Sequence, residues 1–382
     1  MSSQGIIHSK KTLKLTRNNI RSDSEIMFEE IVSAIEQQDY TTAKQLITNH
    51  QHQFPDHPWL IFYTARVKEA EGERETAQKT YQSLLRECSN RKLLSQARER
   101  LLQLKTSQQQ QQEEKITQAL AQPGGKEIAV FILSAIPSEN KKSAAQTLAN
   151  TFQLDPYNAR LQLPSRGWRL FRVGAMGELL YYSKILQQAD IPCFCTALSS
   201  LDTLNVFQVQ YFKSEGDQVT ARCSTSNGQE GSITFNWSEV KAKVQGRVPI
   251  FEQVVTTDAR RKLKRKSGTL DYVQFYDLHL PERSTVLRLC DQKYQFQQSF
   301  SLSENIQKGE TLRRNWLELL NYLEEKIPDV NCWDDFTPFG EGAIEFPQML
   351  RRISSHINLK RRYDTSWDAA FHLYSGLVFF VN

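Results

Sequence analysis

The sequence predicts a multidomain protein that combines an all-α part, a small α/β part and a β part. Apolar residues recur at helical spacing over residues 24–105, and β-rich runs alternate with helical patterns over residues 127–200. Successive short β-rich runs fill residues 205–328 and end in one amphipathic helix. A chain of 382 residues is also too long for one ordinary hydrophobic core, so several domains are expected.

The composition is that of a folded protein with a mild positive charge. Hydrophobic residues make up 39% of the chain and charged residues 24%, which is enough apolar surface to offset the entropy of ordering most of it. The formal net charge of +5 is too small for a surface that tracks a nucleic acid throughout, so any anion site must be local. We find neither a transmembrane-length apolar run nor a signal-peptide core, and a cytoplasmic location is expected.

The helical part follows a polar arm, residues 1–23, that we expect to be flexible. Two helical hairpins are predicted in residues 24–105, and the second repeats the first after 34 positions, as Ala77 repeats Ala43. This period, with a small residue where two helices cross, resembles tetratricopeptide repeats. The sequence departs from that pattern at Ile31, where the family has a small residue, and at Ser89, where it has a proline.

A further amphipathic helix, within residues 90–105, is expected to close the helical stack. Residues 106–126 are rich in glutamine and end in Pro-Gly-Gly, which predicts a linker that is helical at most in its first part. The order strand, helix, short helix, strand, helix, strand then predicts a compact α/β sandwich domain over residues 127–200. That arrangement is similar to the C-terminal domain of the ribosomal stalk protein.

The β part, residues 205–328, contains six or seven β-rich runs and a closing helix. This pattern resembles the pleckstrin-homology-like barrel with its C-terminal helix. The remaining residues, 329–382, are dense in aromatic side chains, so we expect them to dock on the preceding domains. The apolar residues 377–381 are predicted to form a short buried strand.

The predicted repeats carry the strongest functional signal, because stacked helical hairpins expose the first helix of each pair along a surface suited to a peptide. The alternative is that the aromatic residues of this set fill the core between the helices. The predicted groove residues are Phe28, Val32, Ile35, Trp59, Phe62, Arg66 and Glu69.

Six cations within seven residues form a second candidate site, which we place at the tip of a hairpin in the β part. Each cation near an anionic surface contributes about 1 kcal/mol, so the group can bind an acidic protein, a nucleic acid or another anionic ligand. Asp258 and Asp271 flank the run, and a solvated loop is the alternative. The predicted anion-binding residues are Arg260, Arg261, Lys262, Lys264, Arg265 and Lys266.

No catalytic motif is found, so the sequence does not predict an enzyme, a cofactor or a metal site. The histidines are scattered, and the cysteines lack the paired spacing of zinc ligands. Cys193 and Cys195 share one face if their segment is a strand, which packing explains as well as chemistry does. Asp334 and Asp335 are adjacent, so their side chains diverge and a surface or capping role is favoured.

Several phrases, among them "DPYNARLQLPSRGWRLFRVG", "LRLCDQKYQF" and "AFHLYSGLVFF", resemble a family of uncharacterised cyanobacterial proteins that contain tetratricopeptide repeats. The resemblance implies a bacterial cytoplasm but carries no activity and no site residues. The leading hypothesis is therefore an adaptor or scaffold for protein–protein interactions through the helical repeats. The alternative is a regulatory protein that binds a nucleic acid or anionic ligand through residues 260–266.

Overall fold

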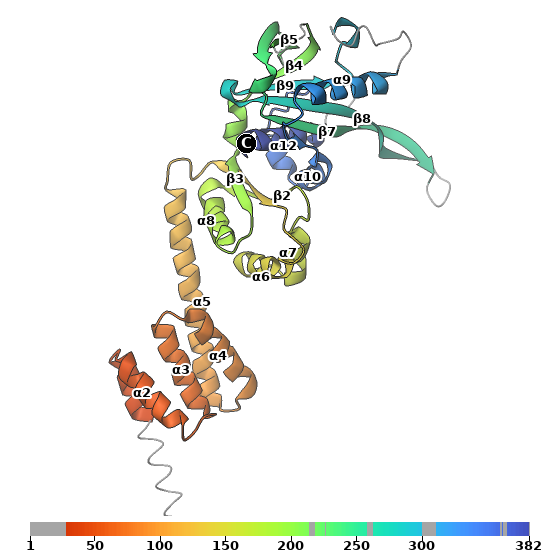
Figure 1. Ribbon diagram of the computed structural model, residues 1–382. Coiled ribbons are helices and arrows are strands. Elements are labelled where there is room, and N and C mark those ends of the chain that lie inside the picture. The colour runs from red at the N-terminus through yellow and green to blue at the C-terminus, as the bar shows by residue number, and fades with distance from the viewer. Residues whose placement is uncertain are drawn as a thin grey trace, which may run out of the picture. The chain divides into compact units, whose positions relative to one another are not determined.

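The computed structural model divides the chain into two units, Met1–Glu114 and Lys115–Asn382 (Figure 1). The predicted arm, residues 1–23, lies outside the described residues. The structure describes residues 28–213, 218–225, 227–257, 263–299, 311–359, 361 and 365–381.

The first unit consists of antiparallel helical hairpins. Its helices are residues 28–36, α2 (Tyr40–Gln51), α3 (Pro58–Ala70), α4 (Arg74–Glu87) and the first part of α5 (Arg91–Leu120). Asp39 caps α2 by accepting a 3.1 Å hydrogen bond from the Thr42 amide, and a proline occupies the first turn of α3. Gly72 takes a φ of +89° between α3 and α4, which a glycine adopts without strain.

The core of this unit follows the spacing that the sequence predicts. Ala43 and Ala77, one in the second helix of each hairpin, are fully buried. Their small side chains let the paired helices approach closely. Tyr81 is also fully buried, one turn beyond Ala77, so the residues of the 34-residue period are core residues.

Helix α5 is longer than predicted, because it continues through most of the expected linker to Leu120. Glutamine, glutamate and lysine are good helix formers, so a run of them extends a helix that has already begun. Buried residues of its first part pack in the first unit, and Ile116 packs against a core of the second. The boundary between the units therefore falls within a helix.

The second unit begins with a three-stranded antiparallel sheet of order β2-β1-β3. β1 alternates its side chains, with Phe131 and Leu133 in the core under the helices and Val130 and Ile132 in the core on the other face. The order of elements is the one that the sequence predicts. The elements are β1 (Ile128–Ser134), α6 (Lys141–Phe152), α7 (Pro156–Gln162), β2 (Trp168–Ala175), α8 (Met176–Gln187) and β3 (Cys193–Ala197).

A seven-stranded sheet follows, with the order β10-β7-β8-β9-β4-β5-β6. This sheet is open, with β10 and β6 at its ends, and no closed barrel forms among the described strands. Its strands are β4 (Asn205–Phe212), β5 (Gln218–Ser224), β6 (Glu230–Asn236), β7 (Ala242–Thr257), β8 (Leu263–Leu280), β9 (Thr285–Cys290) and β10 (Cys332–Trp333). Helix α9 (Leu312–Lys326) buries Trp316, Leu319 and Leu323 in the core on one face of the sheet.

The C-terminal helices lie between the two sheets (Figure 1). Tyr374 shows this placement, because its ring lies 5.9 Å from Trp168 of β2 while Phe371 lies 5.3 Å from Phe275 of β8. One core therefore joins the α/β part, the β part and the C-terminal residues. The helices are α10 (Phe336–Ala343), α11 (Pro347–Leu350) and α12 (Ser366–Val381).

The expected strand at residues 377–381 is wrong, because these residues are the end of α12. Residues 368–378 are all buried, as expected of a helix packed on several sides. A short apolar run fits a buried helix as well as a buried strand, so its length alone could not decide between them.

Candidate functional site

The predicted groove residues divide between core and surface. Phe62 and Ile35 are buried, with 1% and 6% of their surface exposed, so they serve the interhelical core. Phe28, Val32 and Trp59 are half-buried and pack against the same core. Trp59 stacks on Tyr63, with 5.8 Å between ring centroids. The alternative that these aromatic residues fill the core between the helices therefore applies to Phe62 and in part to Trp59.

The polar members of the predicted set lie in a cluster that joins three helices. Glu69 of α3 accepts a 2.9 Å hydrogen bond from the Tyr81 hydroxyl of α4. A guanidinium nitrogen of Arg100 on α5 lies 3.9 Å from the other carboxylate oxygen of Glu69. Arg66 lies one turn before Glu69 on α3, close enough to Arg100 for their charges to repel. We call Arg66 and Arg100 the arginine pair.

The arginine pair has an excess of positive charge. Burial lowers the pKa of Arg66, and the nearby Arg100 lowers it further, while Glu69 acts in the opposite direction. Among the described residues no carboxylate forms an ion pair with Arg66. Two guanidinium groups therefore share one carboxylate at a half-buried position, and a second carboxylate would relieve their repulsion.

The structure corrects the predicted location of the basic run. Arg260, Arg261 and Lys262 lie outside the described residues. Lys264, Arg265 and Lys266 lie within strand β8, where the backbone ladder pairs them with Thr256, Val255 and Val254 of β7. Half of the predicted hairpin tip is therefore strand, because the β-branched residues of β7 extend the pairing as far as Thr257 and Leu263.

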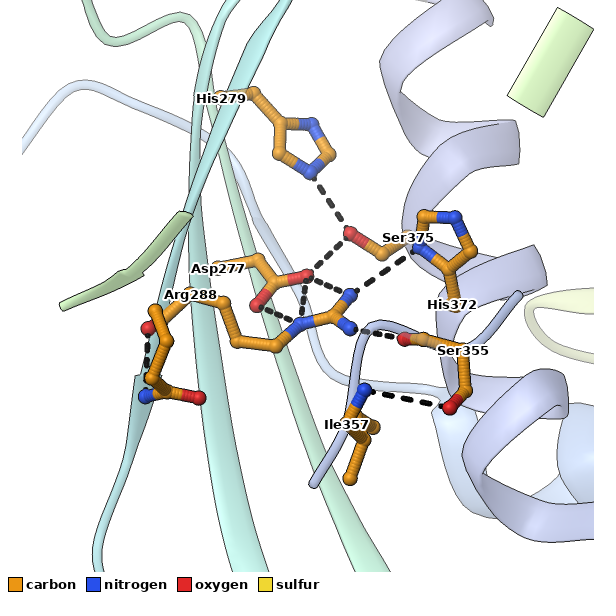
Figure 2. Close-up of polar contacts among 8 residues, drawn as sticks. Asp277, His279, Arg288, Ser355, Ile357, His372 and Ser375 are labelled. Atoms are coloured by element: carbon orange, nitrogen blue, oxygen red, sulfur yellow. Dashed lines mark hydrogen bonds and ion pairs between the residues drawn. The ribbon is translucent and has the colours of Figure 1, made fainter. Parts of the chain in front are cut away.

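The second unit contains a buried polar network that was not expected from the sequence (Figure 2). Its members are Asp277, His279, Arg288, His372 and Ser375. Arg288 donates from Nε and Nη2 to the Asp277 carboxylate over 2.7–3.2 Å. Its Nη1 atom donates to the Ser355 carbonyl oxygen at 2.8 Å. The guanidinium group also lies 5.0 Å from the centre of the Phe371 ring. This side chain thus ties β8 and β9 to the C-terminal residues.

Ser375, His279 and Asp277 lie together but do not form a catalytic triad. The Ser375 hydroxyl donates to Asp277 Oδ2 at 2.6 Å, so its oxygen can only accept from His279 Nε2, 3.0 Å away. A triad requires the opposite arrangement, in which histidine accepts the serine proton. Ser375 is 1% exposed, which also closes it to a substrate. The network is therefore structural.

Burial keeps the histidines of the network neutral. Desolvation lowers the pKa of His279 to about 4, against the smaller effect of Asp277. The pKa of His372 is lowered well below its usual value by burial and then by Arg288, which donates toward His372 Nδ1 over 3.5 Å. His356, whose ring lies 5.0 Å from that of His372, has a lowered pKa for the same two reasons.

One sequence signal could have found the network. Asp277 and His279 lie on the same side of β8 as Phe275, because residues two positions apart share a face of a strand. On β9, Arg288 pairs with Asp277 and lies on the same side as the apolar residues Val286 and Cys290. Opposite charges at inward positions of successive strands predict a buried ion pair. A single histidine in the sequence gives no such signal, which becomes visible only when the two strands are compared.

The cysteines and the adjacent aspartates, the other groups considered from the sequence, have environments that suit a role in packing or ion pairing. Burial raises the pKa of both the Cys193 and the Cys195 thiol, that of Cys195 to about 12, so neither thiol is activated. Asp335 forms a 2.7 Å ion pair with Arg166. Within the described ranges, no three His, Cys, Asp or Glu side chains gather as metal ligands would.

The comparisons with known proteins identify no family. No protein-family model matches the chain, and no curated protein sequence matches it at a significant level. None of the helices among the described residues combines the length and the apolar character needed to span a membrane.

Proposed function

We propose that the chain is a non-enzymatic adaptor whose helical unit binds an acidic segment of a partner protein. The arginine pair is the observation that carries this proposal. Arg66 and Arg100 come from different helices, and Glu69 is the one carboxylate of the described residues that lies near both. An incoming carboxylate would form charge-assisted hydrogen bonds there, which are about twice as strong as neutral ones.

Further expectations belong to the same proposal. The 34-residue period of buried alanines supports a tetratricopeptide-like assignment for the first unit. We also propose a cytoplasmic site of action and a bacterial, cyanobacterial source, for which the sequence resemblance is the support. The pleckstrin-homology-like comparison is kept for the strands and α9 only, because the seven-stranded sheet is open.

The test uses the full chain and a variant with Arg66→Gln and Arg100→Gln. Proteins from a cyanobacterial extract are cross-linked to each form, and the cross-linked segments are identified by mass spectrometry. We expect the wild type to cross-link α3 and α5 to an acidic segment, and the variant to lose that product at least tenfold. Lys105→Gln is the control, because Lys105 is an exposed cation on α5 outside the arginine pair.

Two outcomes would overturn the proposal. One is an unchanged set of cross-linked segments in the arginine variant. The other is an equal loss in the Lys105→Gln control, which would mean that general charge rather than the arginine pair controls capture. Circular dichroism and the melting temperature establish that each variant is folded before its cross-links are compared.

A second candidate function is the binding of a nucleic acid or another anionic ligand by the β7–β8 ribbon. Among the described residues, β9 pairs with β8 over Phe275–Leu280, and β10 pairs with β7 at Lys243 and Val244. The two long strands continue as a ribbon that carries Lys264, Arg265 and Lys266 in its backbone ladder (Figure 1). Paired basic ribbons are one of the forms that enter DNA grooves.

Salt dependence distinguishes the two functions. A ribbon that neutralises six phosphates should lose about a thousandfold in affinity for a fluorescent DNA duplex between 50 and 200 mM salt. Contacts through two arginines should lose far less over the same range. Replacing Lys264, Arg265 and Lys266 by serine should abolish the DNA binding and leave the cross-links of α3 unchanged, and DNA binding that survives this change excludes the ribbon.

A further inference from the structure

A groove of about 590 Å³ lies between the end of α5 and helix α8, entirely within the second unit. The two helices meet at Gly177, where a Cβ atom would lie 2.5 Å from the carbonyl oxygen of Ala119. The Gly177 amide donates a 2.8 Å hydrogen bond to the Gly125 carbonyl oxygen, which fixes the crossing. The groove opens beside this fixed contact, so its two walls are held by the backbone.

The walls of the groove carry residues at helical spacing. Those on each helix lie three or four positions apart, so they share one face. The residues that line the groove along its length are Lys115 and Gln118 of α5, Gln122 just after it, Leu180 and Lys184 of α8, and Gln188 just after that helix.

The charge of the lining is positive and uncompensated. Lys115 and Lys184 are the charged residues of the lining, which includes no aspartate or glutamate of the part of the chain that the structure describes. Both ammonium groups are exposed, and neither forms an ion pair with another described residue. Carboxylates are therefore the complementary groups for the two sides of the groove.

The neutral residues suit a peptide. The side-chain amides of Gln118, Gln122 and Gln188 each donate and accept hydrogen bonds, as a peptide group does, and none is bonded to another described side chain. Leu180 keeps 41% of its surface exposed at the groove and offers an apolar contact. From Gly177 to Gln188 the groove runs along about 16 Å of helix, the length of about five extended residues.

We propose that this groove binds a short acidic peptide segment of a partner protein, with its carboxylates at Lys115 and Lys184 and an apolar side chain on Leu180. The elongated shape and the row of amides favour a peptide over a small anion. The site shares no residue with the arginine pair and lies in the other unit, so it does not rest on the function proposed above.

The experiment uses the full chain with Arg66→Ala and Arg100→Ala, so that the first unit contributes no acidic-peptide binding. The probe is a fluorescein-labelled dodecapeptide, three repeats of Glu-Leu-Gln-Glu, measured by fluorescence anisotropy at 50 mM salt. We expect it to bind, and the same peptide with glutamine for every glutamate to bind at least tenfold more weakly. Lys115→Glu with Lys184→Glu should weaken binding of the acidic probe about tenfold or more.

Lys142→Glu is the matched control, because Lys142 is an exposed cation of α6 outside the groove. It should change the affinity less than twofold, while Leu180→Asp should weaken it as much as the lysine changes do. Failure of the acidic probe to bind, or an equal effect of Lys142→Glu, overturns the proposal. Displacement of the probe by millimolar inorganic phosphate would assign the groove to small anions and overturn the peptide assignment.

Discussion

Asp277 and Arg288 face each other across the β8–β9 ladder, and neither side chain is exposed to solvent. A buried ion pair contributes little net stability when it is intact, but the removal of one partner leaves an unpaired charge in a medium of low polarity. The pair also reaches α12 through Ser375 and the preceding residues through the Ser355 carbonyl oxygen. Its loss is therefore expected to weaken the attachment of the C-terminal helices.

Breaking this pair should be more harmful than removing it. Arg288→Ala should lower the free energy of unfolding of the second unit by about 3 kcal/mol or more, since Asp277 is left buried without its cation. The double variant Asp277→Leu with Arg288→Met removes both charges and should recover much of that loss. Urea denaturation followed by tryptophan fluorescence measures both, and a double variant no more stable than Arg288→Ala contradicts the argument.

The buried histidines predict a loss of stability in mild acid. His279 and His372 stay neutral in the folded protein, whereas the unfolded chain binds protons below about pH 6.5. Each should therefore cost up to about 1.4 kcal/mol per pH unit as the pH falls from 6.5 towards 4. Asp291 acts in the opposite direction, because burial raises its pKa to about 6 and its protonated form stabilises the fold below that pH.

Unfolding free energies between pH 7 and pH 4.5 check this balance. The wild type should lose stability over that range, because two fully buried histidines outweigh one aspartate. His279→Gln should reduce the slope by up to one proton, since glutamine can still donate to Ser375 and does not titrate. Equal slopes in the variant and the wild type would mean that His279 does not control the transition.

The crossing of α5 and α8 should tolerate no side chain at Gly177. Gly177→Ala would place a methyl group 2.5 Å from the Ala119 carbonyl oxygen, so a backbone must move. We expect a loss of about 1–3 kcal/mol and faster amide hydrogen exchange over residues 115–125. Gly342→Ala in α10 is the control, because nothing lies within 4 Å of its added methyl group. It should be neutral or stabilise by up to about 1 kcal/mol.

Substitutions at two neighbouring positions of α3 should differ in their cost to stability, because one position is in the core and the other is half-buried. Phe62 is 1% exposed, so Phe62→Ala should cost about 3 kcal/mol or more. Arg66→Gln, one turn later, should cost less than about 1 kcal/mol, since it removes one of two repelling cations. Thermal unfolding of the two variants tests this, and similar losses in both would show that Arg66 also holds the helices together.

The sequence predicted the elements whose periodicity is strong. Ala43 and Ala77 lie where the repeat places them, and the six elements between residues 128 and 197 have the expected order. Periodicity could not decide two cases. The glutamine run of α5 has no apolar face to show its helix, and the apolar run at residues 377–381 fits either helix or strand.

The candidate sites were less predictable, because they depend on contacts between distant residues. Arg66 was found from its place in the repeat, but its neighbour Arg100 comes from the helix expected only to close the stack. The α5–α8 groove combines residues of the expected linker with those of α8, whose closeness depends on the Gly177 contact. The predicted barrel did not form, since the pairing of distant strands is a property of the whole unit.

The position of α12 between two sheets sets an order of events during synthesis on the ribosome. Trp168 and Phe275 are made long before Tyr374 and Phe371, the aromatic residues that cover them. Until these residues are made, each sheet has an exposed apolar face, and such a face binds chaperones or aggregates. Folding of this unit should finish only after residues 366–381 have left the ribosome, and a stop codon before them should yield an insoluble chain rather than a smaller stable domain.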